Sequence, residues 1–204
     1  MPGGPGSPAC RAQVSTSSFV REPLPNPVSM EVLSERVERL RIPGPGKPVL
    51  SLTGGEPLLQ KEFLARWLPL LGSSWSIYLE TSGIHHGALA ELASQIDVVS
   101  MDVKLPSATG QEPRWEEHRR FLAAAEGTDL FVKAVVTSGT SPGDILEAAR
   151  LIAERDSGLP FILQPASGPT SPGAELLILF QGIALGVLRD VRVIPQVHRV
   201  LHLP

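Results

Sequence analysis

The residues best suited to chemistry follow short apolar stretches, where the strands of an α/β protein would end. Thr53-Gly54-Gly55-Glu56-Pro57 is the first such segment. Its glycines let the backbone come close to a ligand, and the Glu56 carboxylate can accept a hydrogen bond from an ammonium group. Pro57 suits the first turn of a following helix. An ordinary tight turn between a strand and a helix would show the same residues. This segment alone therefore does not distinguish a ligand-binding loop from such a turn.

Three further segments have the same character. Glu80-Thr81-Ser82-Gly83 carries two hydroxyls and a flexible glycine, which would also suit a turn that caps a helix. Asp102-Val103-Lys104 places a carboxylate and an ammonium group on one face of a strand end, and burying such a pair in a core would be costly. Gln164-Pro165 adds an amide that can read the edge of a base or a ribose. His118 lies in a polar helix and has no visible partner, so it receives no role.

These segments require a scaffold of alternating strands and helices. Short stretches rich in β-branched and apolar residues predict strands at 48–52, 76–79, 98–103, 130–136, 161–163 and 191–194. Helical periodicity predicts helices at 58–70, 88–96, 115–125, 142–155 and 174–188, after a first helix that begins behind a Ser29 cap. Ser141 and Ser171, each followed by proline, are predicted to cap the last two helices.

The alternation predicts an α/β fold with parallel strands. Six strands suit an open, partial (β/α) barrel with outer helices better than a closed barrel of eight, and a doubly wound sheet is the competing topology. In both topologies ligands bind at the carboxyl ends of the strands. We therefore expect Glu56, Thr81, Gly83, Lys104 and Gln164 to face one cavity at that rim.

Composition favours one globular domain. The chain has 204 residues, of which 42% are hydrophobic, and a net charge of −3 with both signs mixed, so no nucleic-acid surface is expected. Residues 1–28 are rich in Gly, Pro and Ser and predict a loose N-terminal arm before a single domain at 29–204. One cysteine and no apolar run of about 20 residues favour a cytoplasmic protein without a membrane span. An exposed sheet edge would allow a homodimer.

The strand-end segments resemble those of a known enzyme superfamily. Residues 51–59 resemble the GGEP motif of radical S-adenosylmethionine (SAM) enzymes, and residues 78–83 are similar to the E-T-S/N-G strand end of 7-carboxy-7-deazaguanine synthases. Residues 99–107 and 163–165 match further SAM-side segments of that family, and residues 195–201 resemble its Q-x-H-K-x-L ending. The resemblance covers about residue 29 to Pro204.

The resemblance implies a reaction and a set of ligands. The family rearranges 6-carboxy-tetrahydropterin to 7-carboxy-7-deazaguanine with loss of ammonia, in queuosine biosynthesis, using SAM, a 4Fe–4S cluster and magnesium. The resemblance implies that Thr81 and the carboxylate of Pro204 bind the substrate. It implies no catalytic residue in this chain. The residues that it assigns to SAM are Gly54, Gly55, Glu56, Gly83, Asp102, Lys104, Gln164 and Pro165.

The N-terminal region departs from the family pattern. The family carries C-x-x-x-C-x-x-C followed by Asp-Thr, whereas Cys10 is the only cysteine here, and Thr16 is the counterpart of a magnesium-binding threonine. Three thiolates hold a cluster that leaves one iron open for SAM. We therefore expect no radical chemistry from the chain as written. Three interpretations remain open: a synthase whose N-terminal part is lost or misread, a cluster-free module that binds SAM or a pterin, and an unrelated barrel enzyme.

Overall fold

A computed structural model describes residues 10–16 and 18–197 of the chain. The chain forms two compact units, which are considered separately below. The first comprises Met1–Leu50 and Arg66–Ser76, and the second comprises Ser51–Ala65 and Ile77–Pro204. Within the described residues, no helix has the length and apolar character needed to span a membrane.

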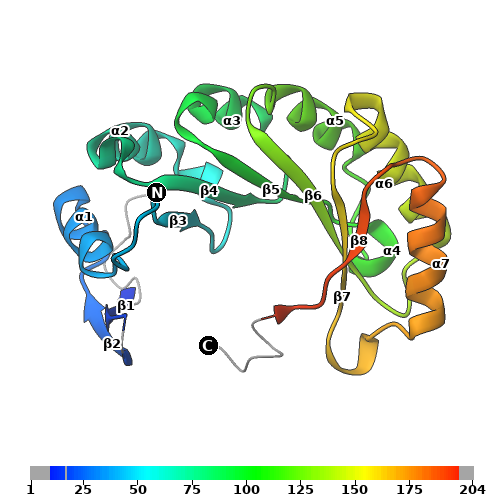
Figure 1. Cartoon of the computed structure of the whole chain (residues 1–204), viewed down its shortest axis with the longest axis horizontal. Coiled ribbons are helices and arrows are strands. Elements are labelled where there is room, and N and C mark those ends of the chain that lie inside the picture. Colours follow the sequence, from blue (N-terminus) through cyan, green and yellow to red (C-terminus); the bar gives the residue numbers. More distant parts are fainter. Residues whose placement is uncertain (1–9, 17, 198–204) are drawn as a thin grey trace. The chain divides into compact units, whose positions relative to one another are not determined.

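A six-stranded sheet dominates the second unit (Figure 1). Its order follows the sequence, β3-β4-β5-β6-β7-β8, and the pairs from β4 to β8 are parallel. The strands are β3 (Val49–Leu52), β4 (Ser76–Thr81), β5 (Val98–Asp102), β6 (Asp129–Val136), β7 (Phe161–Pro165) and β8 (Val191–Val193). All six predicted strands are confirmed, with boundaries that differ by at most two residues.

Helices connect the strands as the periodicity predicts. The α-helices are α2 (Lys61–Leu71), α3 (His86–Leu92), α4 (Pro106–Thr109), α5 (Trp115–Ala124), α6 (Pro142–Arg155) and α7 (Ala174–Leu185). Short 3-10 helices are η1 (Pro57–Gln60), η2 (Gly72–Ser74), η3 (Ala93–Gln95) and η4 (Gly168–Thr170). The prediction missed α4, η2 and η4, which are too short to show a helical period.

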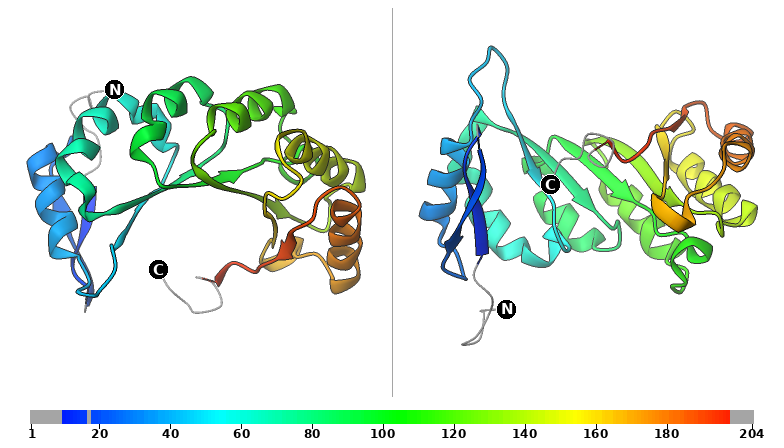
Figure 2. Two further views of the ribbon diagram at one scale, coloured as in Figure 1. Left: turned by 45° about the horizontal axis from the view of Figure 1, so that its top comes forward. Right: turned by 90° about the horizontal axis from the view of Figure 1, so that it is seen from below.

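Helices α3, α5, α6 and α7 lie on one face of the sheet in both orientations (Figures 1 and 2). Side chains on the face under the helices are therefore more buried than those on the other face. In strand β6 the residues alternate between buried and half-buried. Val132 and Ala134 are fully buried, whereas Lys133 between them is half-buried and lies on the opposite face. A doubly wound sheet carries helices on both faces. The sequential strand order and the one-sided helices therefore confirm the open, partial barrel and exclude the competing topology.

The first unit contains a hairpin that the composition did not predict. Strands β1 (Cys10–Ser15) and β2 (Ser18–Leu24) pair antiparallel, and α1 (Met30–Arg39) follows. The expectation of a loose arm without strands is therefore wrong for residues 10–16 and 18–24. Most described side chains of the hairpin are exposed or half-buried, so the alternation that marks a half-buried strand is missing. The boundary predicted at residue 28 between an arm and a domain stays a prediction.

The caps of the last two helices differ from one another. The Ser141 hydroxyl accepts from the Asp144 amide at 3.1 Å and caps α6 as predicted. Helix α7 begins at Ala174 behind Gly173, so the cap predicted at Ser171 is wrong. Gly173 directly precedes α7, and no side chain caps the start of this helix.

We expect Ser141→Ala to lower the free energy of unfolding by about 1 kcal/mol, because the Asp144 amide loses its acceptor. Ser171→Ala is the matched control and should change it by less than about 0.5 kcal/mol. Urea unfolding followed by circular dichroism measures both. Equal losses in the two variants would contradict the different roles of these serines.

Candidate active site

A pocket of about 170 Å³ lies at the carboxyl ends of β3, β4 and β5. Three neighbouring strand ends supply its walls, since parallel strands bring these ends to one edge. The residues that line it are Thr53, Gly54, Gly55, Glu80, Thr81, Ser82, Asp102 and Lys104. Five of the predicted SAM- and substrate-binding residues therefore meet in one place, namely Gly54, Gly55, Thr81, Asp102 and Lys104.

The Gly54-Gly55 loop presents bare backbone to the pocket. Gly54 has a φ of 100°, a conformation that residues with a Cβ rarely adopt. No atom outside the loop lies within 4 Å of the position that a Cβ would occupy at Gly54 or Gly55. A ligand can therefore approach the peptide groups of this loop closely, as the sequence predicts.

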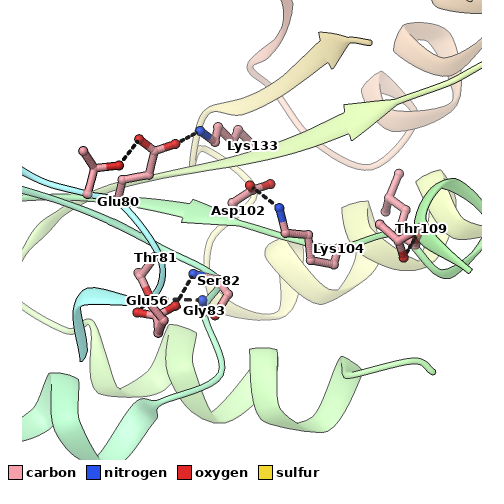
Figure 3. Close-up of polar contacts among 11 residues, drawn as sticks. Glu56, Glu80, Thr81, Ser82, Gly83, Asp102, Lys104, Thr109 and Lys133 are labelled. Atoms are coloured by element: carbon pink, nitrogen blue, oxygen red, sulfur yellow. Dashed lines mark hydrogen bonds and ion pairs between the residues drawn. The ribbon is translucent and has the colours of Figure 1, made fainter. Parts of the chain in front are cut away.

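The Glu56 carboxylate ties this loop to the end of β4 (Figure 3). Oε1 accepts from the Thr81 hydroxyl at 2.8 Å and from the Leu58 amide at 3.2 Å. Oε2 accepts from the amide and the hydroxyl of Ser82 at 2.9 and 2.5 Å. A carboxylate has about four acceptor positions, and here all are used. Glu56 is thus a positioning group in this structure, and its predicted role as acceptor for a ligand's ammonium group stays a prediction.

Glu80 is the carboxylate that the pocket leaves accessible. Its side chain is 34% exposed, forms an ion pair with Lys133 of β6, and accepts from the Thr53 hydroxyl at 3.2 Å. Burial opposes ionisation, but the hydrogen bond and charge of Lys133 outweigh it and lower the pKa of Glu80. Glu80 is therefore a carboxylate at neutral pH and a suitable acceptor for a cation.

Asp102 and Lys104 form the second acid–base pair of the pocket. Lys104 Nζ donates to Asp102 Oδ2 at 2.6 Å, and the Lys104 side chain is 42% exposed. Asp102 Oδ1 is buried and has no hydrogen-bond partner among the described residues. The Ser100 hydroxyl, two residues earlier on the same strand, is buried without a partner in the same part of the chain. Buried polar groups are usually satisfied, so this strand end has unused hydrogen-bonding capacity.

Gly83 is held from two sides. Its φ is 68°, and a Cβ at this position would lie 2.6 Å from Met101 Cγ, so only glycine fits. Its amide donates to the Thr81 hydroxyl at 3.3 Å, and its carbonyl lies 2.9 Å from Nδ1 of His118. His118 is 1% exposed, which corrects the expectation that it lacks a partner. Burial lowers the pKa of His118. The neutral ring therefore donates from Nδ1 to Gly83.

Several assigned residues are not among those that line the pocket, and Glu56 and Gly83, which were expected to face it, belong to this group. Gln164 and Pro165 end β7 and pair in register with residues of β6, but they do not line it. In the first unit, Cys10 is exposed at the start of β1, and Thr16 is exposed in the hairpin turn. Pro204 lies outside the described residues. Throughout 10–16 and 18–197, no three histidine, cysteine or carboxylate side chains are arranged to hold a metal ion.

Five residues of the site received no role from the sequence, namely Thr53, Glu80, Ser82, Lys133 and His118. Thr53, Glu80 and Ser82 stood in recognised segments without being assigned. Lys133 offered a signal, because it is the single charged residue between Leu130 and Val136, and a charge in an apolar strand requires a partner. His118 offered none, since a histidine in a polar helix is typical of a surface.

Comparison with known proteins assigns the chain to a class of enzymes. The chain is 36% identical to 7-carboxy-7-deazaguanine synthase of Geobacter sulfurreducens over 204 residues, covering 98% of this chain and 82% of the relative. The synthase of Methanothermobacter thermautotrophicus is 29% identical over 76% of this chain and 70% of its own length. A GTP 3′,8-cyclase of Moorella thermoacetica is 31% identical over 64% of this chain and 44% of its own.

A solved structure shows the same fold. TYW1 with a lysine-pyruvate adduct bound superposes with a TM-score of 0.53 at 12% identity, covering 86% of this chain and 68% of that one. No protein-family model matches the chain. The fold is that of the radical SAM superfamily. Within it, the chain belongs to the 7-carboxy-7-deazaguanine synthase family.

We expect the stability of the chain to fall as the pH drops below about 6.5. The pKa of His118 is lowered in the folded state, so the unfolded chain binds a proton there that the folded chain does not. His118 therefore contributes stability that is complete above about pH 6.5 and is lost as the pH falls toward its folded pKa. Urea unfolding at about pH 7.5 and about pH 5.5 measures the loss.

His118→Asn keeps a donor near the Gly83 carbonyl and removes the titration, so its loss of stability between the two pH values should be smaller. His85→Asn is the control, because this half-buried residue directly precedes α3 without capping it. The same pH dependence in the wild type and in His118→Asn would show that His118 is not the group whose protonation destabilises the chain.

Proposed function

We propose that the pocket at the ends of β3, β4 and β5 binds the amino acid end of SAM. The observation that carries this proposal is the meeting of open backbone, an accessible carboxylate and a half-exposed ammonium group in one small pocket. The volume of about 170 Å³ is below the roughly 300–1,000 Å³ typical of sites for whole ligands. Such a pocket takes one end of SAM, and the nucleoside extends beyond it.

The chemistry of the lining residues matches a zwitterion. Glu80 accepts from the ammonium group of the ligand, and the peptide groups of Gly54 and Gly55 add neutral contacts. Lys104 donates to the ligand's carboxylate, since charge-assisted hydrogen bonds of this kind are strong. Glu56 acts by holding the glycine loop against β4. Gln164 and Pro165, at the end of β7, are proposed to meet the nucleoside part.

The substrate proposed from the family is 6-carboxy-tetrahydropterin, a small molecule. Thr81 is 3% exposed, and its hydroxyl donates to Glu56 and accepts from Gly83, so it contributes by positioning these two residues. The Pro204 carboxylate is the second proposed substrate contact. A cytoplasmic location and a homodimer, both predicted from the sequence, belong to the same proposal.

The residues present do not fit a 4Fe–4S cluster. A site-differentiated cluster needs three thiolates, and the chain has Cys10 alone. Thr16, proposed for magnesium, has no companion group of carboxylates, cysteines or histidines within the described ranges. We propose that these 204 residues bind SAM without cleaving it, and that the SAM pocket does not depend on the cluster.

A second function is favoured by the extent of the sequence match. Identity to the Geobacter sulfurreducens synthase runs over 98% of the chain, and the pocket motifs are kept. If three thiolates are supplied, the reaction proposed is the family's rearrangement of 6-carboxy-tetrahydropterin to 7-carboxy-7-deazaguanine.

We expect isothermal titration calorimetry to detect SAM binding by the chain. Lys104→Met should weaken it by about 10-fold or more, because a charged hydrogen bond to the ligand is lost. Lys47→Met changes an exposed lysine outside the pocket and should leave the affinity unchanged. No heat of binding in the wild type, or equal weakening in both variants, would reject the proposed pocket.

Anaerobic reconstitution with iron and sulfide, followed by reduction, should yield no 5′-deoxyadenosine from SAM, because one cysteine cannot hold the cluster. The Geobacter sulfurreducens relative serves as the positive control. Grafting an N-terminal segment that carries the C-x-x-x-C-x-x-C motif of the family onto this chain should restore cleavage if the pocket is intact. Turnover by the unmodified chain would disprove the claim.

A further inference from the structure

Two acid–base pairs lie side by side on the open face of three neighbouring strands (Figure 3). Glu80 comes from β4, Asp102 from β5 and Lys133 from β6, while Lys104 follows β5. The Lys133 and Asp102 side chains are each only 15% exposed. A charge that is largely removed from water needs a partner in every state of the protein.

The pairing does not follow the register of the sheet. Lys133 lies directly opposite Asp102 on the adjacent strand, yet it pairs with Glu80 one strand further away. Asp102 meanwhile uses only Oδ2, for Lys104, and leaves Oδ1 buried without a partner in the described part of the chain. Lys133 therefore has two carboxylates on the open face near its strand, and one of them has a vacant oxygen.

We propose that Lys133 is a positioning residue that neutralises Glu80 in the ligand-free pocket and moves to Asp102 when the ammonium group of a zwitterionic ligand takes Glu80. This inference rests on the proposed binding of SAM and deepens it. The exchange breaks the Glu80–Lys133 and Lys104–Asp102 ion pairs, and it forms an ammonium–Glu80 pair, a Lys133–Asp102 pair and a pair between Lys104 and the ligand's carboxylate. No proton or electron is transferred.

The exchange keeps every buried charge paired. When Lys133 reaches Asp102, the carboxylate no longer depends on Lys104, whose half-exposed ammonium group is then free for the ligand's carboxylate. A ligand without an ammonium group leaves the Glu80–Lys133 pair in place. Lys104 then stays paired with Asp102 and is not released for the ligand. The pocket thereby selects nucleosides that carry an amino acid end, because only they offer an ammonium group to Glu80 and a carboxylate to Lys104.

A ligand-free experiment tests whether Lys133 moves. Glu80→Gln removes its present partner, so Lys133 should transfer to Asp102 without any ligand. Double-mutant cycles of Lys133→Met and Asp102→Asn, measured by urea unfolding, report their coupling in each background. We expect the coupling in the unfolding equilibrium constant to rise by about fivefold or more from wild type to Glu80→Gln. An unchanged coupling would overturn the movement.

A binding experiment tests whether the amino acid end drives the movement. The same cycle is measured by calorimetry with SAM, with S-adenosyl-L-homocysteine, which lacks the sulfonium charge, and with 5′-methylthioadenosine, which lacks the amino acid end. The first two ligands should show a coupling of about fivefold or more in Kd, and the third less than about twofold. Lys133→Arg, which keeps the charge, should restore most of the SAM affinity lost in Lys133→Met.

The unfolding experiment and the binding experiment together distinguish a failure of the Lys133 exchange from a failure of SAM binding. Equal coupling for SAM and 5′-methylthioadenosine would overturn the exchange while leaving SAM binding intact. If the wild type binds none of the three nucleosides, SAM binding and the ligand-driven exchange both fall. In that case the unfolding cycles still decide whether Lys133 shifts between the two carboxylates.

Discussion

The Glu56 carboxylate is the constraint on which the site depends. Its two oxygens accept four hydrogen bonds, three of them from Thr81 and Ser82 at the end of the next strand. The would-be Cβ positions of Gly54 and Gly55 face open space among the described residues, so no side chain packs over the loop at these positions. The hydrogen bonds of the Glu56 carboxylate therefore hold the loop, and its backbone remains accessible at the rim of the pocket. Gly83 is held by the same network through the Thr81 hydroxyl.

The two faces of the sheet differ in polarity and in burial. The face under the helices is apolar, and residues such as Leu79, Val132 and Leu163 are fully buried there. The open face of the same strands carries Glu80 and Lys133, which would be costly to bury beneath helices. Because side chains alternate along a strand, one segment can contribute to both faces. The partial barrel leaves this second face uncovered, and the charged groups remain accessible to a ligand.

The pocket and the single cysteine of these 204 residues lie in different units of the chain. Among the described residues, every hydrogen bond that shapes the pocket joins residues of the second unit, whereas Cys10 lies in the hairpin of the first. Family membership and a sequence with one cysteine are thus compatible. Recognition of SAM needs backbone, a carboxylate and ammonium groups, whereas its reductive cleavage needs thiolates.

The sequence by itself determined the six strands of the sheet, most of the helices and the four strand-end segments, because each is a local pattern of apolar period, cap and turn residues. Tertiary structure decided which of these residues act together. Glu80 and Lys133 are 53 residues apart, Gly83 and His118 are 35 apart, and Glu56 and Thr81 are 25 apart. Pairing over such distances depends on which strand ends become neighbours and on which side chains share a face, and no local pattern specifies either. The hairpin of residues 10–24 was missed because its strands lack the alternation that burial of one face produces.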